Sequence, residues 1–124
     1  MIAISHANFD RAVEEALDSI PDEFRPYLEN VIVEVRGRPD AKLMREYDVP
    51  DDSLGLYVGV PLDEKGPDLA PLPMPDRVLI FRDNLCEMCD SRAELVDEIR
   101  ITVLHEIGHH FGLDEDRLAD LGYD

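Results

Sequence analysis

The sequence predicts a single domain that combines α-helices with a few short β-strands. Apolar residues recur with helical spacing in residues 5–20 and again in a long segment that opens at Ser91, whereas shorter segments between them have strand-like patterns. With 124 residues, the chain can bury roughly two-thirds of the surface of its unfolded form in one core. We therefore expect residues 1–124 to form one domain.

One continuous apolar stripe predicts the first helix. We expect this stripe to pack against the hydrophobic core. The stripe follows the spacing i, i+3, i+4, i+7, i+8, i+11 and consists of Phe9, Ala12, Val13, Ala16, Leu17 and Ile20. Pro21 and Pro26 then bracket a turn or a second short helical piece.

Three segments have the residue patterns of strands. "VIVEVRG" at 31–37 alternates apolar and polar residues, and "RVLIFR" at 77–82 is a short apolar run typical of a buried strand. In "LGLYVGV" at 54–60, Gly55, Tyr57 and Gly59 share the face opposite the leucines and valines. The two missing side chains on that face permit another backbone to approach closely.

Two connecting segments are less regular. "KLMREYDV" at 42–49 is ambiguous between helix and loop. Residues 61–76 contain five of the chain's nine prolines, which is too many for a helix or a central strand. We expect a stiff loop there that forms a wall beside a cleft.

A long helix is expected to begin after Ser91, because Ser91 and Glu94 have the spacing of a capping box. Its apolar residues cover more of the circumference than a surface helix needs, and include Leu95, Val96, Ile99, Ile101, Val103, Leu104, Ile107 and Phe111. We therefore expect this helix to be central and buried. It also carries three of the four histidines.

The segment "HEIGH" within this helix has the H-E-x-x-H pattern of a metal site. His105 and His109 are about one turn apart, so both imidazoles can bind one ion. Glu106 is the glutamate of the pattern, which takes a proton from metal-bound water. His110 projects about 100° around the helix from His109, so we expect it to be packed or hydrogen-bonded rather than a ligand.

A catalytic zinc site needs a third protein ligand, and a straight helix would carry the following residues away from the metal. Gly112 can adopt the positive φ that ends a helix and reverses the chain. Glu115 would then return toward the histidines, flanked by Asp114 and Asp116. Glu115 is the candidate third ligand, and its two neighbours are the alternatives.

The arrangement H-E-x-x-H-x-x-G-x-x-(ligand), from His105 to Glu115, resembles that of the zincin metallopeptidases. Together with "EEALDSIP" and "LGLYVGVPL", it is similar to the short bacterial minimal zincins over most of the chain. The resemblance implies an α+β fold in which a small mixed β-sheet packs on a long active-site helix, with an N-terminal helix and a short C-terminal helix. It also implies bound zinc and the hydrolysis of peptides.

Two features depart from the pattern that the resemblance implies. The family commonly has aspartate where this chain has Glu115, which leaves open which of the three carboxylates binds the metal. Metzincins also have a methionine turn after the motif, whereas the last methionine here, Met88, precedes it.

The leading hypothesis is a zinc-dependent metallopeptidase with His105, His109 and Glu115 as ligands. Glu106 would be the general base that takes a proton from the metal-activated water. The partner would be a peptide or protein substrate that pairs with the edge of a strand, either "RVLIFR" or "LGLYVGV".

Several residues have roles that the sequence leaves open. Tyr57 and Tyr123 could donate to an oxyanion, although a core or rim position is commoner for tyrosine. Arg117 could orient a ligand carboxylate or form a surface ion pair. Cys86 and Cys89 have C-x-x-C spacing, but without a second metal-binding pair or a βαβ unit we expect reduced, partly buried thiols.

Two other classes of function use the same motif. A catalytically idle metal-binding interaction module would need the metal only for stability, but a closed structural site calls for a fourth ligand rather than for Glu106. A metal-dependent ribonuclease of the rRNA-maturation type has ligands at the same offsets. That family has glycine in place of Glu106 and histidine in place of Glu115.

The net charge of the chain limits the classes of molecule that it can bind. It has 29 acidic and 12 basic residues and a net charge of −17, which repels nucleic acids and anionic membranes and attracts basic substrates. Neither a signal peptide nor an apolar run of the ~20 residues that cross a bilayer is apparent. We expect a cytoplasmic protein that binds neither nucleic acid nor membrane.

Overall fold

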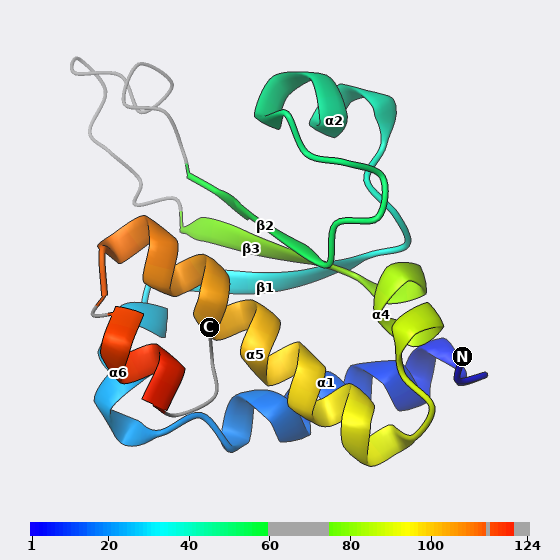
Figure 1. Cartoon of the computed structure of the whole chain (residues 1–124), viewed down its shortest axis with the longest axis horizontal. Coiled ribbons are helices and arrows are strands. Elements are labelled where there is room, and N and C mark those ends of the chain that lie inside the picture. Colours follow the sequence, from blue (N-terminus) through cyan, green and yellow to red (C-terminus); the bar gives the residue numbers. More distant parts are fainter. Residues whose placement is uncertain (60–74, 114, 121–124) are drawn as a thin grey trace.

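The computed structural model describes residues 1–59, 75–113 and 115–120, except for the side chain of Glu115. In chain order, the elements are α1 (His6–Asp18), the 3-10 helix η1 (Asp22–Leu28), β1 (Val31–Arg36), α2 (Ala41–Tyr47), β2 (Gly55–Val58), β3 (Asp76–Phe81), α4 (Arg82–Met88), α5 (Arg92–Phe111) and α6 (Glu115–Asp120) (Figure 1). The α+β class is confirmed. Residues 61–74 of the predicted proline-rich loop lie outside the described residues.

The described strands form one mixed sheet in the order β1-β3-β2. β1 runs parallel to β3, with Val33 opposite Val78, and β2 runs antiparallel to β3, with Leu56 opposite Leu79. β3 is therefore the central strand, which explains its continuous run of buried residues. The expectation that "RVLIFR" offers an edge to a substrate is wrong, because β3 is paired on both sides.

α1 forms where its apolar stripe predicts. Ser5 caps the helix, because its hydroxyl accepts a hydrogen bond of 3.1 Å from the backbone N–H of Asn8. Most of the predicted stripe is buried, namely Phe9, Ala12, Val13, Ala16 and Ile20. These residues pack against α5, so α1 forms the outer layer of the core.

α5 lies between α1 and the sheet, as the predicted central helix should (Figure 1). Leu95, Ile99, Val103 and Ile107 follow one another along its inner side and are fully buried. Each such side chain contributes roughly 1.5–3 kcal/mol to stability through the hydrophobic effect. None of the described helices is long and apolar enough to span a membrane.

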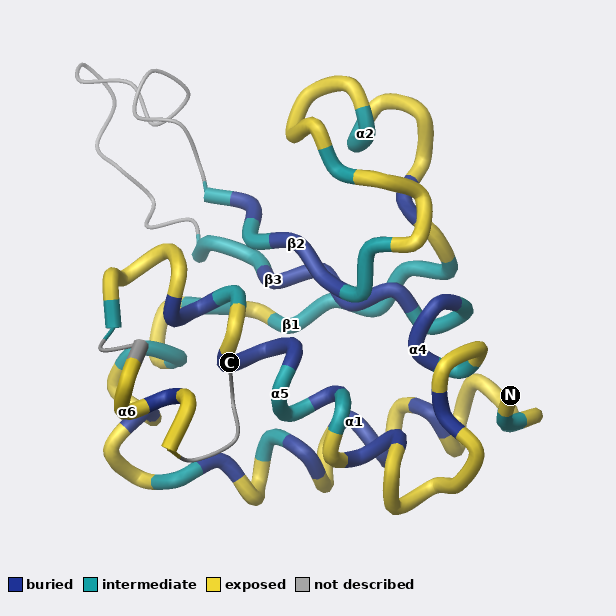
Figure 2. The backbone as a smooth tube through the Cα atoms, in the orientation of Figure 1, coloured by how far each residue is buried: buried dark blue, intermediate teal, exposed yellow. Residues whose placement is uncertain are grey.

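The prediction that α5 is central and buried holds for one side of the helix, whereas the other side and the C-terminal end are exposed. Figure 2 shows exposed residues there, and His109, His110 and Phe111 are all exposed. His105, one turn earlier, is exposed as well. The helix therefore has a buried side that holds the core and a solvent-facing side that carries the histidines.

α2 covers the opposite face of the sheet. Leu56, Val58, Leu79 and Phe81 form a second small cluster there, and Leu43 of α2 packs on it together with Val49. Asp40 caps α2 by accepting a hydrogen bond of 2.8 Å from the backbone N–H of Leu43. The ambiguous segment 42–49 is thus mainly helical, because its apolar side chains have a sheet face to cover.

α4 is an element that the sequence patterns did not predict. It follows β3 directly and contains only seven residues. Asn84, one of its buried residues, donates to the carbonyl oxygens of Asp51 and Ser53, both at 2.8 Å, and accepts from Arg38 at 2.7 Å. α4 therefore holds the loop that leads into β2.

Candidate active site

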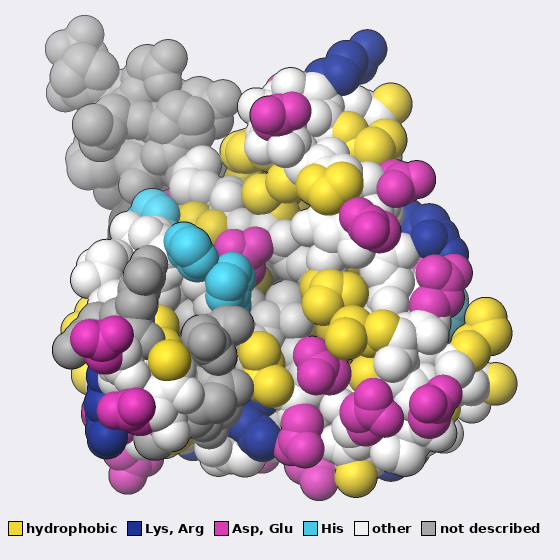
Figure 3. All heavy atoms as spheres, viewed as in Figure 1, with side chains coloured by type: hydrophobic (Ala, Val, Ile, Leu, Met, Phe, Trp, Pro, Cys, Tyr) yellow, Lys and Arg dark blue, Asp and Glu magenta, His cyan; other side chains and the backbone are white. Residues whose placement is uncertain are grey.

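His105 and His109 lie side by side on the exposed side of α5. Their ring centroids are 4.4 Å apart, and the ring planes are inclined by 58°. Figure 3 shows histidine side chains gathered on one face of the molecule, next to an acidic side chain. Two exposed imidazoles at this separation suit the binding of one metal ion.

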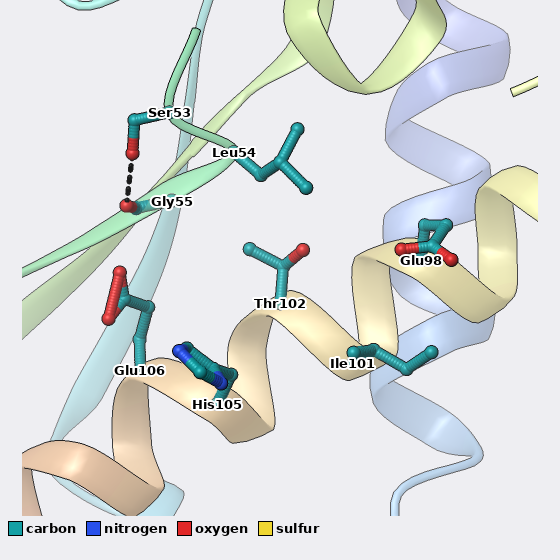
Figure 4. A pocket seen from close by; sticks show the side chains of 8 residues that line it. All are labelled: Ser53, Leu54, Gly55, Glu98, Ile101, Thr102, His105 and Glu106. Carbon is teal, nitrogen blue, oxygen red and sulfur yellow. Dashed lines mark hydrogen bonds between the residues drawn. The ribbon is translucent and has the colours of Figure 1, made fainter. Parts of the chain in front are cut away.

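Glu106 points from α5 toward β2 (Figure 4). Its side chain is partly buried, and this burial raises the pKa of the carboxyl above its usual value, while the neighbouring His109 opposes the shift. The three residues of the H-E-x-x-H motif are therefore in two environments. The histidines face solvent, and the glutamate lies in the space between helix and strand.

The glycine face of β2 allows the strand to lie directly on α5. A Cβ atom on Gly55 would be 2.6 Å from Cγ2 of Thr102, 3.2 Å from the carbonyl oxygen of Leu79 and 3.5 Å from Cγ of Glu106. The predicted close approach is confirmed at this position. At Gly59 the nearest atom would be 3.8 Å away, which is ordinary contact.

A cavity of about 370 Å³ lies between the start of β2 and α5. His105 and Glu106 line it, together with Ser53, Leu54, Glu98, Ile101 and Thr102 (Figure 4). Ser53 is held in place by a hydrogen bond of 2.9 Å from its hydroxyl to the carbonyl oxygen of Gly55. Two of the predicted site residues thus border a space that can take up part of a ligand.

α5 ends at Gly112, as predicted. Gly112 has a φ of 62°, and its N–H donates to the carbonyl oxygen of Gly108, as does the N–H of Leu113 at 3.0 Å. The chain then reverses into α6, and a Cβ atom on Gly108 would be only 2.6 Å from Cδ1 of Leu118. α6 therefore packs back on the end of α5 that carries the histidines.

The third ligand remains a prediction. Glu115 is the first residue of α6, but its side chain and the whole of Asp114 lie outside the described residues, as does Tyr123. Asp116 is described and exposed. Among the side chains that the structure describes, no three His, Cys, Asp or Glu residues are arranged to hold a metal ion. The histidine pair and Glu106 are brought together, and Asp116 does not join them.

Tyr57 and His110 form a contact at one end of the site. Their rings stack with centroids 3.8 Å apart and planes inclined by 10°. The hydroxyl of Tyr57 donates to Oδ2 of Asp76 at 2.7 Å, and burial together with this hydrogen bond raises the pKa of Tyr57 well above its usual value. His110 is thus packed, as predicted, and Tyr57 is a rim residue whose hydroxyl proton is directed at Asp76.

The remaining residues of uncertain role have structural contacts. Arg117 donates to both carboxylate oxygens of Glu23, at 2.9 and 3.4 Å, and so links α6 to the start of η1. Cys86 and Cys89 are free thiols. Cys89 is buried, and this raises its pKa to about 11. Cys86 is half-buried, as predicted, whereas Cys89 is fully buried, and the reduced state of the two thiols stays a prediction.

Comparisons with known proteins give a family and a similar fold. A family model described as zincin-like metallopeptidase matches residues 28–123. Among solved structures, a conserved hypothetical protein from Thermus thermophilus has a similar fold, with a TM-score of 0.53 and 24% sequence identity over 97% of this chain and 100% of that chain. A comparison with curated protein sequences gives no match.

Proposed function

The chain belongs to the zincin-like metallopeptidase family, and on this basis we propose that it is a zinc-dependent peptidase with Glu106 as its general base. The observation that carries the proposal is the grouping of two adjacent imidazoles with a partly buried carboxylate, of which His105 and Glu106 border one cavity. Peptide hydrolysis needs a Lewis acid, a proton acceptor and room for the substrate. The residues on α5 are suited to hold the first and to supply the second.

The donor set suits zinc. Neutral imidazole nitrogen atoms are among the preferred ligands of this ion, and His105 and His109 present two of them from one side of a rigid helix. Glu115 is proposed as the third ligand, because the helix ends at Gly112 and α6, whose first residue is Glu115, packs on α5 through Leu118. When bound, zinc lowers the pKa of a water molecule toward ~7 and polarises the carbonyl that is attacked.

Glu106 moves the proton in this proposal. Its carboxylate accepts a proton from the attacking water and later donates it to the nitrogen of the departing amine, so that one group acts first as base and then as acid. Its place between α5 and β2 partly shields it from bulk water. This shielding keeps the proton available for the leaving group.

β2 is the proposed docking edge for the substrate. Within the described part of the chain, β2 pairs with β3 and with no second strand. Gly55 lies over Thr102, and Tyr57 lies over His110, so β2 follows the course of α5 past His105 and Glu106. An extended peptide that adds to this edge by main-chain hydrogen bonds would therefore run past the proposed catalytic groups.

The proposal is tested by incubating the purified protein with a peptide library and identifying the products by mass spectrometry. We expect cleavage that a zinc chelator abolishes and that added zinc restores. Cleavage that persists after complete metal removal would contradict a metal-dependent mechanism. Tight zinc binding without cleavage of any peptide would instead favour a module that uses the metal only for stability.

A further inference from the structure

The cavity beside the proposed catalytic groups joins apolar surface to a carboxylate. Leu54 and Ile101 supply apolar walls, Thr102 adds a methyl and a hydroxyl group, and Glu98 supplies the carboxylate (Figure 4). Such a lining is complementary to a ligand with an apolar stem and a cationic end. The cavity volume of about 370 Å³ is ample for one amino-acid side chain.

Glu98 differs from the acidic residues beside it on α5. Asp97 accepts a hydrogen bond of 2.6 Å from Arg100, and the side chain of Glu94 accepts one of 3.2 Å from the backbone N–H of Asp90. No Lys, Arg or His among the described residues forms an ion pair with Glu98. Glu98 is half-buried and lines the cavity, so its charge is available to a cation that enters there.

The spacing along α5 sets which side chains can reach Glu98. It precedes His105 by seven residues, close to two helical turns, so the two residues project from the same side of the helix. Seven residues correspond to about 10.5 Å of helix axis. A substrate whose scissile bond lies beside Glu106 therefore needs a long side chain to place a charge against Glu98.

We propose that this cavity is a specificity pocket for a lysine or arginine side chain of the substrate, next to the scissile bond, and that Glu98 selects its charge. The proposal rests on the proposed peptidase function, which puts the scissile bond at Glu106. The methylene groups of the side chain pack on Leu54 and Ile101, and its cationic end pairs with Glu98. An acidic side chain is repelled from the same place.

Glu98 selects the charge of one substrate side chain. This effect differs from the general attraction of an acidic chain for basic peptides. The net charge of −17 attracts cations to the whole surface and distinguishes poorly between positions in a peptide. Glu98 acts on the one side chain that enters the cavity. A preference set by Glu98 therefore appears at one substrate position and disappears when this single carboxylate is neutralised.

The first test compares peptides that differ only at the position next to the scissile bond, which carries lysine, norleucine or glutamate. Lysine and norleucine have equal aliphatic stems, so their difference reports the charge. We expect kcat/KM to be about two- to fivefold higher for lysine than for norleucine, the order that a partly exposed ion pair supplies. The ratio should fall as salt is added.

Three variants at two adjacent positions locate the charge that is responsible. Glu98→Gln should bring the lysine-to-norleucine ratio close to one, and Glu98→Lys should turn the preference toward the glutamate peptide. Asp97→Asn removes the same charge from the adjacent residue, which does not line the cavity, and should leave the ratio as in the wild type. An equal loss of preference in Asp97→Asn and Glu98→Gln would overturn the proposal.

A binding measurement distinguishes failure of this proposal from failure of the proposed function. The peptides are titrated into metal-free Glu106→Gln protein and followed by amide chemical shifts. The lysine peptide should bind more tightly than the norleucine peptide and shift Ser53 and Thr102, and the added Glu98→Gln change should remove the difference. This result would support the pocket even if the wild type cleaved nothing. Equal binding of the two peptides would overturn the pocket whatever the cleavage assay showed.

Discussion

Replacing Glu106 should affect peptide cleavage without affecting zinc binding. The change Glu106→Gln keeps the shape of the side chain and leaves His105 and His109 in place, so zinc affinity and the unfolding temperature should stay near those of the wild type. Cleavage should fall by about 10²- to 10⁴-fold, the usual cost of losing a general base. The measurements are a zinc titration, a thermal melt and kcat/KM on one peptide. Undiminished cleavage would remove Glu106 from the mechanism.

The third ligand is tested by alanine variants of three adjacent carboxylates. Glu115→Ala should weaken zinc binding by about tenfold or more, because a site with two histidines alone holds the ion less well. Asp114→Ala and Asp116→Ala serve as matched controls and should weaken it much less. Competitive titration against a chromogenic chelator measures all three. If Asp114 proved to be the costly position, the register past Gly112 would be wrong, although the histidine pair would keep its role.

At the residue scale, the sequence predicts those parts of the site that are local to α5. His105, Glu106 and His109 come together because helical geometry alone determines their separation, and Gly112 reverses the chain for equally local reasons. The contact of Tyr57 with His110 joins residues more than fifty positions apart, and no local pattern indicates it. The seven-residue spacing of Glu98 from His105 is visible in the sequence. Exposed residues on an ordinary solvated helix face have the same spacing, so it does not by itself indicate a pocket.

At the scale of elements, the close fit of β2 on α5 predicts a steric effect. Gly55→Ala would bring a methyl group against Thr102 and the backbone of Leu79, at separations of 2.6 and 3.2 Å. We expect a loss of about 1–3 kcal/mol in the free energy of unfolding, as for other overpacked interiors. Chemical denaturation measures it. Cleavage should fall as well, because Glu106 borders the same interface.

Gly59→Ala is the matched control for this substitution. Gly59 lies just beyond the same strand, and its added methyl group would meet nothing closer than 3.8 Å, so its effect on stability should be small. Combining Gly55→Ala with Thr102→Ser removes the closest contact and should recover part of the lost stability. Equal stability of the two alanine variants would show that β2 can move away from α5 at little cost.

Helices with a long apolar periodicity can be predicted from this sequence. Short elements and the order of the strands in the sheet cannot. α1 and α5 repeat their apolar residues over three turns or more, which is enough to identify a helix. α4 has seven residues, of which only Asn84 and Leu85 are buried, so it lacks a stripe to recognise. The central place of β3 depends on pairing with β1 and β2 from elsewhere in the chain. A short apolar run alone does not reveal which strand lies in the middle.

At the scale of the whole molecule, the excess of 29 acidic over 12 basic residues predicts that salt stabilises the fold. Like charges repel one another more strongly in the compact state, and raising the ionic strength from about 0.01 M to about 1 M shortens the Debye length from about 30 Å to about 3 Å. We expect the unfolding temperature to rise with NaCl in a thermal melt. A steady fall would mean that ion pairs such as Arg92–Glu15 outweigh the repulsion.

α5 carries the scaffold on one side and the chemistry on the other. Leu95, Ile99 and Val103 are locked into the interior, whereas Glu98 and His105 border open space. Exchanges in the second set leave the packing of the first set unchanged, so the two can diverge at different rates. Over evolutionary time, proteins that share this helix can therefore change their substrate specificity while their fold stays the same.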